Sequence, residues 1–215
     1  MIKIIFEDNH LLVVEKPFNM PVNSDSSKDE NLLDLLKEDL KRRYNKPGEA
    51  YLGLVHRLDR PVGGVMVFAK TSKAASRLSK QIRDLKFSKT YLAVVEGKTP
   101  KQATYKDRIL KDTKTNISKV DAQGKLSTLQ YKTIKYKDNL SLVEIDLLSG
   151  RSHQIRVQFS FHNFPLWGDQ KYNKNTKPPA QIALFSHKLS FFHPITNEQL
   201  VFTANTNEVP FNLFN

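Results

Sequence analysis

Residues 51–69 read YLGLVHRLDRPVGGVMVFA, a polar loop enclosed by two apolar segments. The flanking segments, residues 51–55 and 65–69, have the composition of strands. The second contains no polar side chain, which is typical of a buried strand. We therefore expect a loop whose two ends are fixed by strands.

The segments around this loop alternate between strand and helix patterns. Residues 1–16 predict two short strands, and the capping-box spacing of residues 27–30 predicts the start of a leucine-rich helix. A basic amphipathic helix is expected over residues 72–86, with Leu85 on its apolar face, and a strand over residues 88–96.

The second half of the chain is rich in strand patterns. Apolar and polar residues alternate over much of residues 104–148, a helix is compatible with 152–161, and two closing strands are expected near 182–192 and 199–203. No repeat, linker or change of composition divides the chain. We therefore predict one α+β domain over residues 1–215, with a mostly antiparallel sheet and no separate module before it.

The net charge favours a polyanionic partner. The chain has 34 Lys and Arg against 22 Asp and Glu, a formal net charge of +12, which attracts nucleic acid or an anionic membrane surface. Lys73, Arg77 and Lys80 recur at helical spacing and predict a cationic ridge. A solvated face is the simpler interpretation of any single helix. Its apolar face lacks Trp and Phe anchors, so nucleic acid is favoured over a membrane.

Several classes of site are excluded by composition. Cysteine is absent, which excludes disulfides, thiolate metal sites and a cysteine nucleophile. The six histidines are isolated rather than spaced as metal ligands, so we expect no bound metal. Neither a signal-peptide core nor a run of about 18 uncharged apolar residues occurs. The sequence therefore predicts a soluble, cytoplasmic protein.

The loop itself carries a candidate catalytic residue, Asp59, which stands between Arg57 and Arg60. Neighbouring cations keep a carboxylate ionised, as a nucleophile or an electrostatic stabiliser requires. A turn with a structural ion pair is the alternative. A second polar cluster, residues 149–156 (SGRSHQIR), offers a cation that could pair with such an aspartate. An N-capped helix with surface arginines is its alternative.

Five stretches, in order, resemble the signature of the RluA-type pseudouridine synthases. They are HRLDR at residues 56–60, followed by Gly64 and FAK at 68–70; KTYLA at 89–93; GRSHQIRV at 150–157; GD at 168–169; and HP at 193–194. The resemblance implies an enzyme that isomerises uridine in RNA without a cofactor. It also implies a mixed, mostly antiparallel central sheet flanked by helices, with a basic active-site cleft.

The resemblance assigns roles to individual residues. Asp59 corresponds to the catalytic aspartate, and Arg156 resembles the arginine that pairs with it. Tyr91 corresponds to the tyrosine that packs on the target base and is implicated in proton transfer. Arg57 corresponds to a residue that fills the gap left by the flipped uridine. Further substrate-binding residues are expected at Arg60, Arg151, His153, Lys73, Arg77 and Lys80, with Ile182 and Leu184 beneath the base.

Five positions depart from the family pattern. Gly63 stands where Ser or Thr is usual, Gln158 where His is common, Phe-Ser at 185–186 in place of His-Ala, and Asn173 in place of a frequent Gly. None is a catalytic position, so only the pocket wall and the choice of target are expected to differ. Many relatives carry an RNA-binding module before the catalytic domain. We expect this chain to recognise its target with its own surface.

The implied reaction fits these residues. Uracil must leave the sugar, turn and rejoin through C5, after the nucleotide has been flipped out of its RNA structure. Tyr91 offers a stacking surface. An ionised Asp59 could attack the sugar or the ring, or remove a sugar proton to give a glycal. A single aspartate suits a leaving group that stays in the pocket, whereas glycosidases use paired carboxylates.

Two other functions remain open on the sequence. A non-catalytic RNA-binding or chaperone protein could use the same cleft, but it would not need Asp59. A hydrolase of nucleosidic bonds would need a second carboxylate, for which Asp169 is the only candidate. We expect a monomer that acts on ribosomal RNA, with transfer RNA as the alternative target.

Overall fold

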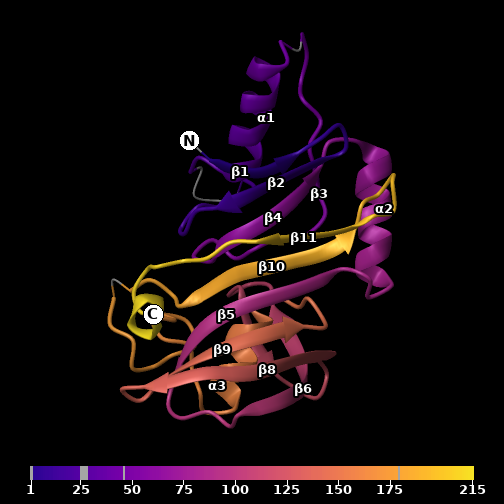
Figure 1. Cartoon of the computed structure of the whole chain (residues 1–215). Coiled ribbons are helices and arrows are strands. Elements are labelled where there is room, and N and C mark those ends of the chain that lie inside the picture. The colour runs from indigo at the N-terminus through magenta and orange to yellow at the C-terminus, as the bar shows by residue number, and fades with distance from the viewer. Residues whose placement is uncertain (1, 25–28, 46, 179) are drawn as a thin grey trace. The chain divides into compact units, whose positions relative to one another are not determined.

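The structure, a computed structural model, describes residues 2–24, 29–45, 47–178 and 180–215, and Figure 1 labels its helices and strands. The chain divides into two compact units. Unit 1 comprises Met1–Ser88 and Ser186–Asn205, and unit 2 comprises Lys89–Phe185 and Thr206–Asn215. The single domain expected over residues 1–215 stays a prediction.

Unit 1 is built on antiparallel strands. Its elements are β1 (Lys3–Glu7), β2 (Leu11–Lys16), α1 (Leu32–Arg43), β3 (Gly53–Leu54), β4 (Gly63–Ala69), α2 (Ser72–Arg83), β10 (Leu184–Phe192, of which the first two residues belong to unit 2) and β11 (Gln199–Thr203). The strand order is β1-β2-β4-β10, with β11 beside β10 and β3 beside β4. The pairs β1–β2, β2–β4, β3–β4 and β10–β11 are antiparallel.

Strand β4 lies between β2 and β10 in this sheet, and all of its seven residues are buried. Its start is fixed by Gly64, which has a φ of 119°. A Cβ at this position would collide with the backbone of Ser186 in β10, so only glycine allows the approach. The buried strand expected over residues 65–69 is therefore confirmed. The strand expected over residues 51–55 is shorter than predicted, since β3 covers only Gly53–Leu54.

Helix α1 begins later than the capping-box spacing predicts. Its N-cap is Asn31, whose side-chain oxygen accepts a hydrogen bond from the backbone N of Asp34 at 3.1 Å. This contact satisfies one of the free N–H groups of the first turn, which defines the start of the helix. Residues 27 and 28 lie outside the described part of the chain. The predicted leucine face is confirmed, since Leu32, Leu36 and Leu40 are buried.

Helix α2 ends earlier than the sequence pattern suggests. It begins after the N-cap Thr71 and ends at Arg83. The prediction that Leu85 continues its apolar face is wrong, because Leu85 has a φ of 57° and is 75% exposed. A left-handed residue cannot continue a right-handed helix, so the chain turns before Leu85 could reach the core.

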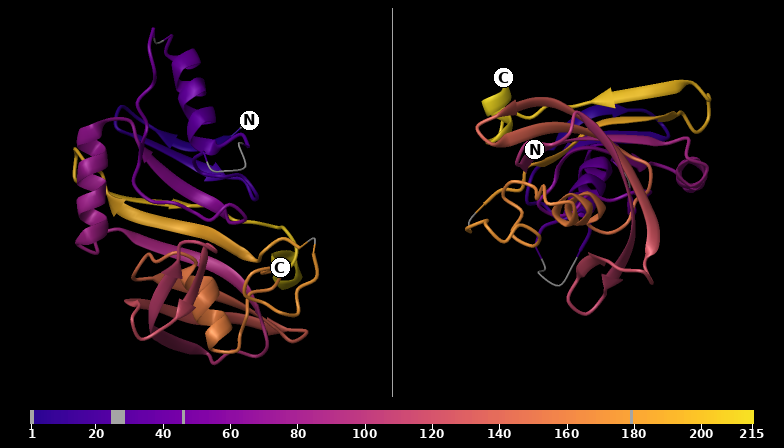
Figure 2. Two further views of the ribbon diagram at one scale, coloured as in Figure 1. Left: turned by 180° about the vertical axis from the view of Figure 1, so that it is seen from behind. Right: turned by 90° about the horizontal axis from the view of Figure 1, so that it is seen from below.

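Unit 2 is also built on antiparallel strands, with a helix packed against them (Figure 2). Its elements are β5 (Ser88–Glu96, which begins on the last residue of unit 1's first segment), β6 (Gln102–Asp112), β7 (Ile117–Val120), β8 (Lys125–Lys137), β9 (Leu140–Leu147), α3 (Gln154–Phe161) and the 3-10 helix η1 (Phe211–Phe214). The strand order is β5-β9-β8-β6-β7, antiparallel throughout. The left view of Figure 2 shows α3 lying against the strands of this unit.

Aromatic side chains hold α3 on its sheet. The ring of Phe159 lies 5.3 Å from that of Tyr105 and 5.1 Å from that of Tyr131. The basic loop that follows α3 is closed at its base by Gly168, whose φ of 73° and close approach to Gln181 exclude a Cβ.

The predicted α+β class with mostly antiparallel strands is confirmed in both units. The basic cleft stays a prediction. Within the described residues, no helix is long and apolar enough to cross a membrane.

Candidate functional site

The loop that carries Asp59 is attached to its own unit through backbone groups. The backbone N of Val67 in β4 donates to Nε2 of His56 at 3.2 Å, so the proton of this imidazole is on Nδ1. The backbone N of Val62 donates to the carbonyl oxygen of Asp59 at 2.9 Å and closes a turn. Leu58 is buried beside it. Backbone groups on both sides of Asp59 therefore help to fix the path of the loop.

Lys16, the last residue of β2, is a third anchor of this turn. It is only 1% exposed, and its Nζ donates to the carbonyl oxygens of Pro17 at 2.9 Å and Arg60 at 3.0 Å. Burial lowers the pKa of Lys16 to about 7, the charge of Asp59 opposes this shift, and the charge of Arg60 adds to it. A buried ammonium thus supports the segment that carries the predicted catalytic residue.

The three charged residues of the loop differ in exposure. Asp59 is half-buried, whereas Arg57 and Arg60 are exposed. Nη2 of Arg60 lies 2.6 Å from Oδ2 of Asp29, and an exposed pair of this kind adds little stability. The exposed side chain of Arg57 is therefore accessible to an anionic ligand, whereas Arg60 already pairs with Asp29.

The cationic ridge of α2 also lies in unit 1. Lys73, Arg77 and Lys80 are all exposed, as predicted. Arg77 has a structural contact as well, because its Nη1 donates to the carbonyl oxygen of Pro194 at 2.6 Å. This bond attaches α2 to the turn between β10 and β11, so Lys73 and Lys80 are the cleaner candidates for RNA contacts.

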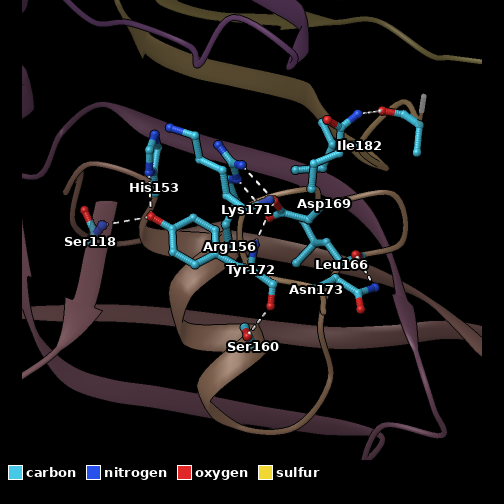
Figure 3. Close-up of polar contacts among 12 residues, drawn as sticks. Ser118, His153, Arg156, Ser160, Leu166, Asp169, Lys171, Tyr172, Asn173 and Ile182 are labelled. Atoms are coloured by element: carbon cyan, nitrogen blue, oxygen red, sulfur yellow. Dashed lines mark hydrogen bonds and ion pairs between the residues drawn. The ribbon is translucent and has the colours of Figure 1, made fainter. Parts of the chain in front are cut away.

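In unit 2, Arg156 forms a buried, bidentate ion pair with Asp169 (Figure 3). Its Nε donates to Oδ2 of Asp169 at 2.9 Å and its Nη2 to Oδ1 at 2.7 Å. The backbone N atoms of Lys171 and Tyr172 donate to the same Oδ1, at 3.0 and 3.3 Å. The side chain of Asp169 has no exposed surface, so its carboxylate orients Arg156 rather than a water molecule.

Tyr172 connects this ion pair to two further segments (Figure 3). The guanidinium carbon of Arg156 lies 5.1 Å from the centre of its ring, within the range of a cation–π contact. Its hydroxyl lies 2.7 Å from Nδ1 of His153 and accepts a hydrogen bond from the backbone N of Ser118 at 2.8 Å. His153 precedes α3 with a φ of 55°. The structure thus brings the predicted residues His153 and Arg156 together around Tyr172.

The predicted apolar residues of the base pocket are buried in unit 2. Tyr91, Ile182 and Leu184 are 6%, 2% and 4% exposed. The carbonyl oxygen of Ala183 accepts a hydrogen bond from the backbone N of Val94 in β5 at 3.1 Å. Residues 182–184 therefore run beside the strand that carries Tyr91, and their place beneath the base stays a prediction.

Two departures from the family pattern have structural partners. Gln158 is buried and donates from Nε2 to Oδ2 of Asp107 at 2.7 Å. Asn173 is buried as well, and its Nδ2 donates to Oε1 of Glu96 at 2.5 Å. Both amides therefore bind half-buried carboxylates of the same unit, and neither contacts the ion pair of Arg156.

The sequence reasoning missed Lys16 and the part played by Asp169 and Tyr172. Lys16 could have been found, because strand residues two apart share a face and Val14, two positions earlier, lies in the core. The partner of Arg156 could not be found in this way. Asp169 lies 13 residues away, a spacing that neither helical nor strand periodicity predicts. Asp59 and Arg156 belong to different units, and their pairing stays a prediction.

Among the described residues, no group of three or more histidine, aspartate and glutamate side chains is placed to hold a metal ion.

Comparison with known proteins points to one family. A family model described as RNA pseudouridylate synthase matches residues 10–161. The chain is 33% identical over 213 residues to ribosomal large subunit pseudouridine synthase C of Buchnera aphidicola, covering 94% of this chain and 66% of the relative. It is 34% identical over 218 residues to ribosomal large subunit pseudouridine synthase D of Zymomonas mobilis, covering 94% and 68%. The chain thus spans about two thirds of the length of these relatives.

Solved structures agree on the fold. Human RNA pseudouridylate synthase domain containing 4 superposes with a TM-score of 0.79 at 22% identity, covering 94% of this chain and 88% of that one. Human RNA pseudouridylate synthase domain containing 1 gives 0.77 at 22% identity, covering 98% and 86%.

Proposed function

Because the chain belongs to the RNA pseudouridylate synthase family, a family of isomerases, we propose that it converts uridine to pseudouridine in ribosomal RNA with Asp59 as its catalytic group. Two curated relatives are named for the large ribosomal subunit, which supports ribosomal over transfer RNA. The net charge of +12 suits this substrate. The protein would work in the cytoplasm, as a monomer and without a cofactor.

The observation that carries the catalytic assignment is the buried pair of Arg156 and Asp169. A guanidinium has five N–H donors in a planar fork, and Asp169 takes two of them, through Nε and Nη2. The remaining edge, formed by Nη1 and Nη2, matches a second carboxylate. We assign Asp59 to that edge, so that Arg156 orients the catalytic carboxylate while Asp169 orients Arg156.

The reaction breaks the N1–C1′ bond of uridine, forms a C5–C1′ bond, moves a proton from C5 and leaves N1 protonated. Asp59 acts on the sugar or on the ring, and the detached uracil turns over on the ring of Tyr91. Ile182 and Leu184 form the apolar floor beneath the base. A buried, apolar floor keeps the uracil in place without competing hydrogen bonds, which a turning base requires.

The remaining predicted residues would bind the RNA around the flipped nucleotide. Arg57 fills the gap that the uridine leaves in its stack. The other predicted residues contact the RNA backbone or sugar: Arg60, Lys73, Arg77, Lys80, Arg151 and His153. Phosphate contacts of this kind position the RNA without reading its sequence.

Tritium release tests this function directly. Ribosomal RNA transcribed with uridine tritiated at C5 is incubated with the wild-type protein, and isomerisation releases the label into water. We expect release of one or a few equivalents per RNA, with pseudouridine mapped to the same positions in cells that carry the gene and absent from cells that lack it. Tight RNA binding without release would support the non-catalytic RNA-binding alternative and overturn the proposal.

Removal of divalent cations tests the absence of a metal cofactor. We expect tritium release to persist in EDTA on an RNA substrate that folds without magnesium, because the proposed chemistry uses only side chains. Rescue of a lost activity by one specific divalent ion would contradict the proposal.

A further inference from the structure

Lys89 is a half-buried cation near the start of β5, two residues before Tyr91. Side chains two apart on a strand point to the same face, with Cα atoms about 7 Å apart. The long Lys89 side chain therefore shares a face with the ring on which we place the target base. An ammonium there can reach the sugar-phosphate of the same nucleotide or of its neighbour.

The acidic residue nearest in the sheet does not neutralise Lys89. Asp146 in β9 is paired in register with Thr90 and accepts a hydrogen bond from its Oγ1 at 2.9 Å. Thr90 follows Lys89 directly, so Thr90 and Asp146 occupy the other face of the sheet. Within the described residues the side-chain ammonium of Lys89 makes no hydrogen bond or ion pair. Burial lowers its pKa.

Gly150 provides space for the Lys89 side chain. A Cβ built on Gly150 would lie 3.3 Å from Nζ of Lys89, so the ammonium lies directly against this backbone. The next residue, Arg151, is exposed, and its backbone N donates to Oε1 of Gln154 at 3.1 Å, which fixes the segment before α3. The ammonium of Lys89 thus lies against the residue that precedes Arg151, and in the described part of the chain neither side chain has a carboxylate partner.

We propose that Lys89, with Arg151 as a second contact, binds a phosphodiester group of the RNA next to the base that stacks on Tyr91. A half-buried charge without a partner is costly, and a phosphate supplies the missing negative charge together with several acceptor oxygens. This inference rests on the proposed function, since it takes RNA as the substrate. It assigns Lys89 to binding and positioning, and leaves bond-breaking to Asp59.

The test compares Lys89→Met, which keeps the length of the side chain and removes the charge, with Lys89→Arg, which keeps the charge. For Lys89→Met we expect a KM for ribosomal RNA about tenfold higher and a kcat within about twofold of wild type. The slope of log affinity against log salt should flatten by about 0.7–0.9, the value of one phosphate contact. Lys89→Arg should keep the wild-type slope.

Two further variants separate this site from general charge effects. Lys132→Met removes an exposed lysine of β8 and serves as the matched control, with an unchanged slope expected. Gly150→Ala adds the Cβ that would crowd Nζ of Lys89, and we expect a smaller rise in KM in the same direction. Thermal unfolding of each variant verifies that it is folded.

The outcomes are distinct. A folded Lys89→Met protein with the wild-type KM and salt slope would overturn the inference, as would a loss of kcat with unchanged RNA affinity, which would make Lys89 part of the chemistry. If the wild-type protein bound RNA but released no tritium, the proposed function would fail on its own, whatever the slope of the Lys89 variants.

Discussion

The turn that carries Asp59 and the helix that carries Arg156 are held in place by different kinds of contact. In unit 1 the anchors reach backbone atoms, as in the bond from Lys16 Nζ to the carbonyl oxygen of Arg60. In unit 2 the contact is made by the functional side chain itself, because the guanidinium of Arg156 donates two hydrogen bonds to the carboxylate of Asp169. The described contacts of the first site thus fix its backbone, whereas those of the second fix the functional side chain.

Asp59→Asn gives the largest expected effect on activity. We expect tritium release to fall by about 10⁴-fold or more, because an amide can replace neither a nucleophile nor a base. The charge of Asp59 also acts on the buried Lys16, so urea unfolding of the variant measures what its loss costs and verifies that the protein is folded. RNA affinity, measured on the same preparation, should be unchanged or slightly higher. A folded variant with a tenth of the wild-type rate would exclude Asp59 as the catalytic group.

Asp169→Asn and Arg156→Ala should lose both activity and stability. Each leaves a buried charge without its partner, which costs about 3–5 kcal/mol, and urea unfolding measures the loss. The double variant Arg156→Met/Asp169→Leu removes both charges and should regain part of the stability but none of the activity. Wild-type stability and activity in Asp169→Asn would show that Arg156 does not depend on this partner.

Lys16→Met should change how stability depends on pH. The unfolded chain binds the lysine proton up to a pKa of 10.5, and the folded protein only up to about 7. Between these values the unfolded state holds more protons, so the free energy of unfolding of the wild type rises with pH by at most about 1.4 kcal/mol per unit.

In Lys16→Met this contribution disappears, and the curve of unfolding free energy against pH should be flatter between pH 7 and 9.5. Urea unfolding across that range measures it. Parallel curves for the two proteins would mean that Lys16 keeps its proton in the fold.

The α2 ridge gives the smallest expected effect. Lys73→Ala/Lys80→Ala should flatten the slope of log RNA affinity against log salt by about 1.4–1.8, two phosphate contacts, with stability unchanged. Arg77→Ala should instead lose about 1 kcal/mol of stability, the net value of its hydrogen bond to Pro194. An unchanged slope in the double variant would make the ridge ordinary solvated surface.

Local patterns predicted most of the fold and one half of the site. The buried strand around Val67 and the leucine face of α1 follow from burial and period, which act over a few residues. Leu85 was misplaced because helical periodicity continues past the residue where the chain turns. Its φ of 57° belongs to the turn that ends the helix, in which the backbone N of Lys86 donates to the carbonyl oxygen of Gln81 at 2.8 Å.

The site divides in the same way. Asp59 is visible in the sequence because its cations are its neighbours along the chain. The contacts that support Arg156 are not visible in the sequence. One of them is through Tyr172, which bonds to Ser118, 54 residues before it in the chain. Contacts of this range are decided by how strands and loops pack, and a single sequence carries no local signal for them.

Gly168 has a consequence for how this protein could change its target. It brings together the two ends of the loop that returns at Gln181, and the backbone N of Ala183 bonds to the carbonyl oxygen of Trp167 at 2.9 Å just outside it. When the ends of a loop are already joined, each doubling of its length costs only about 0.6 kcal/mol. Asp169 and Asn173 fix the first part, so residues inserted beyond them would lengthen an exposed, lysine-bearing surface and leave Arg156 where it is. The segment is a place where new RNA preferences could evolve, or be designed, at little cost to the fold.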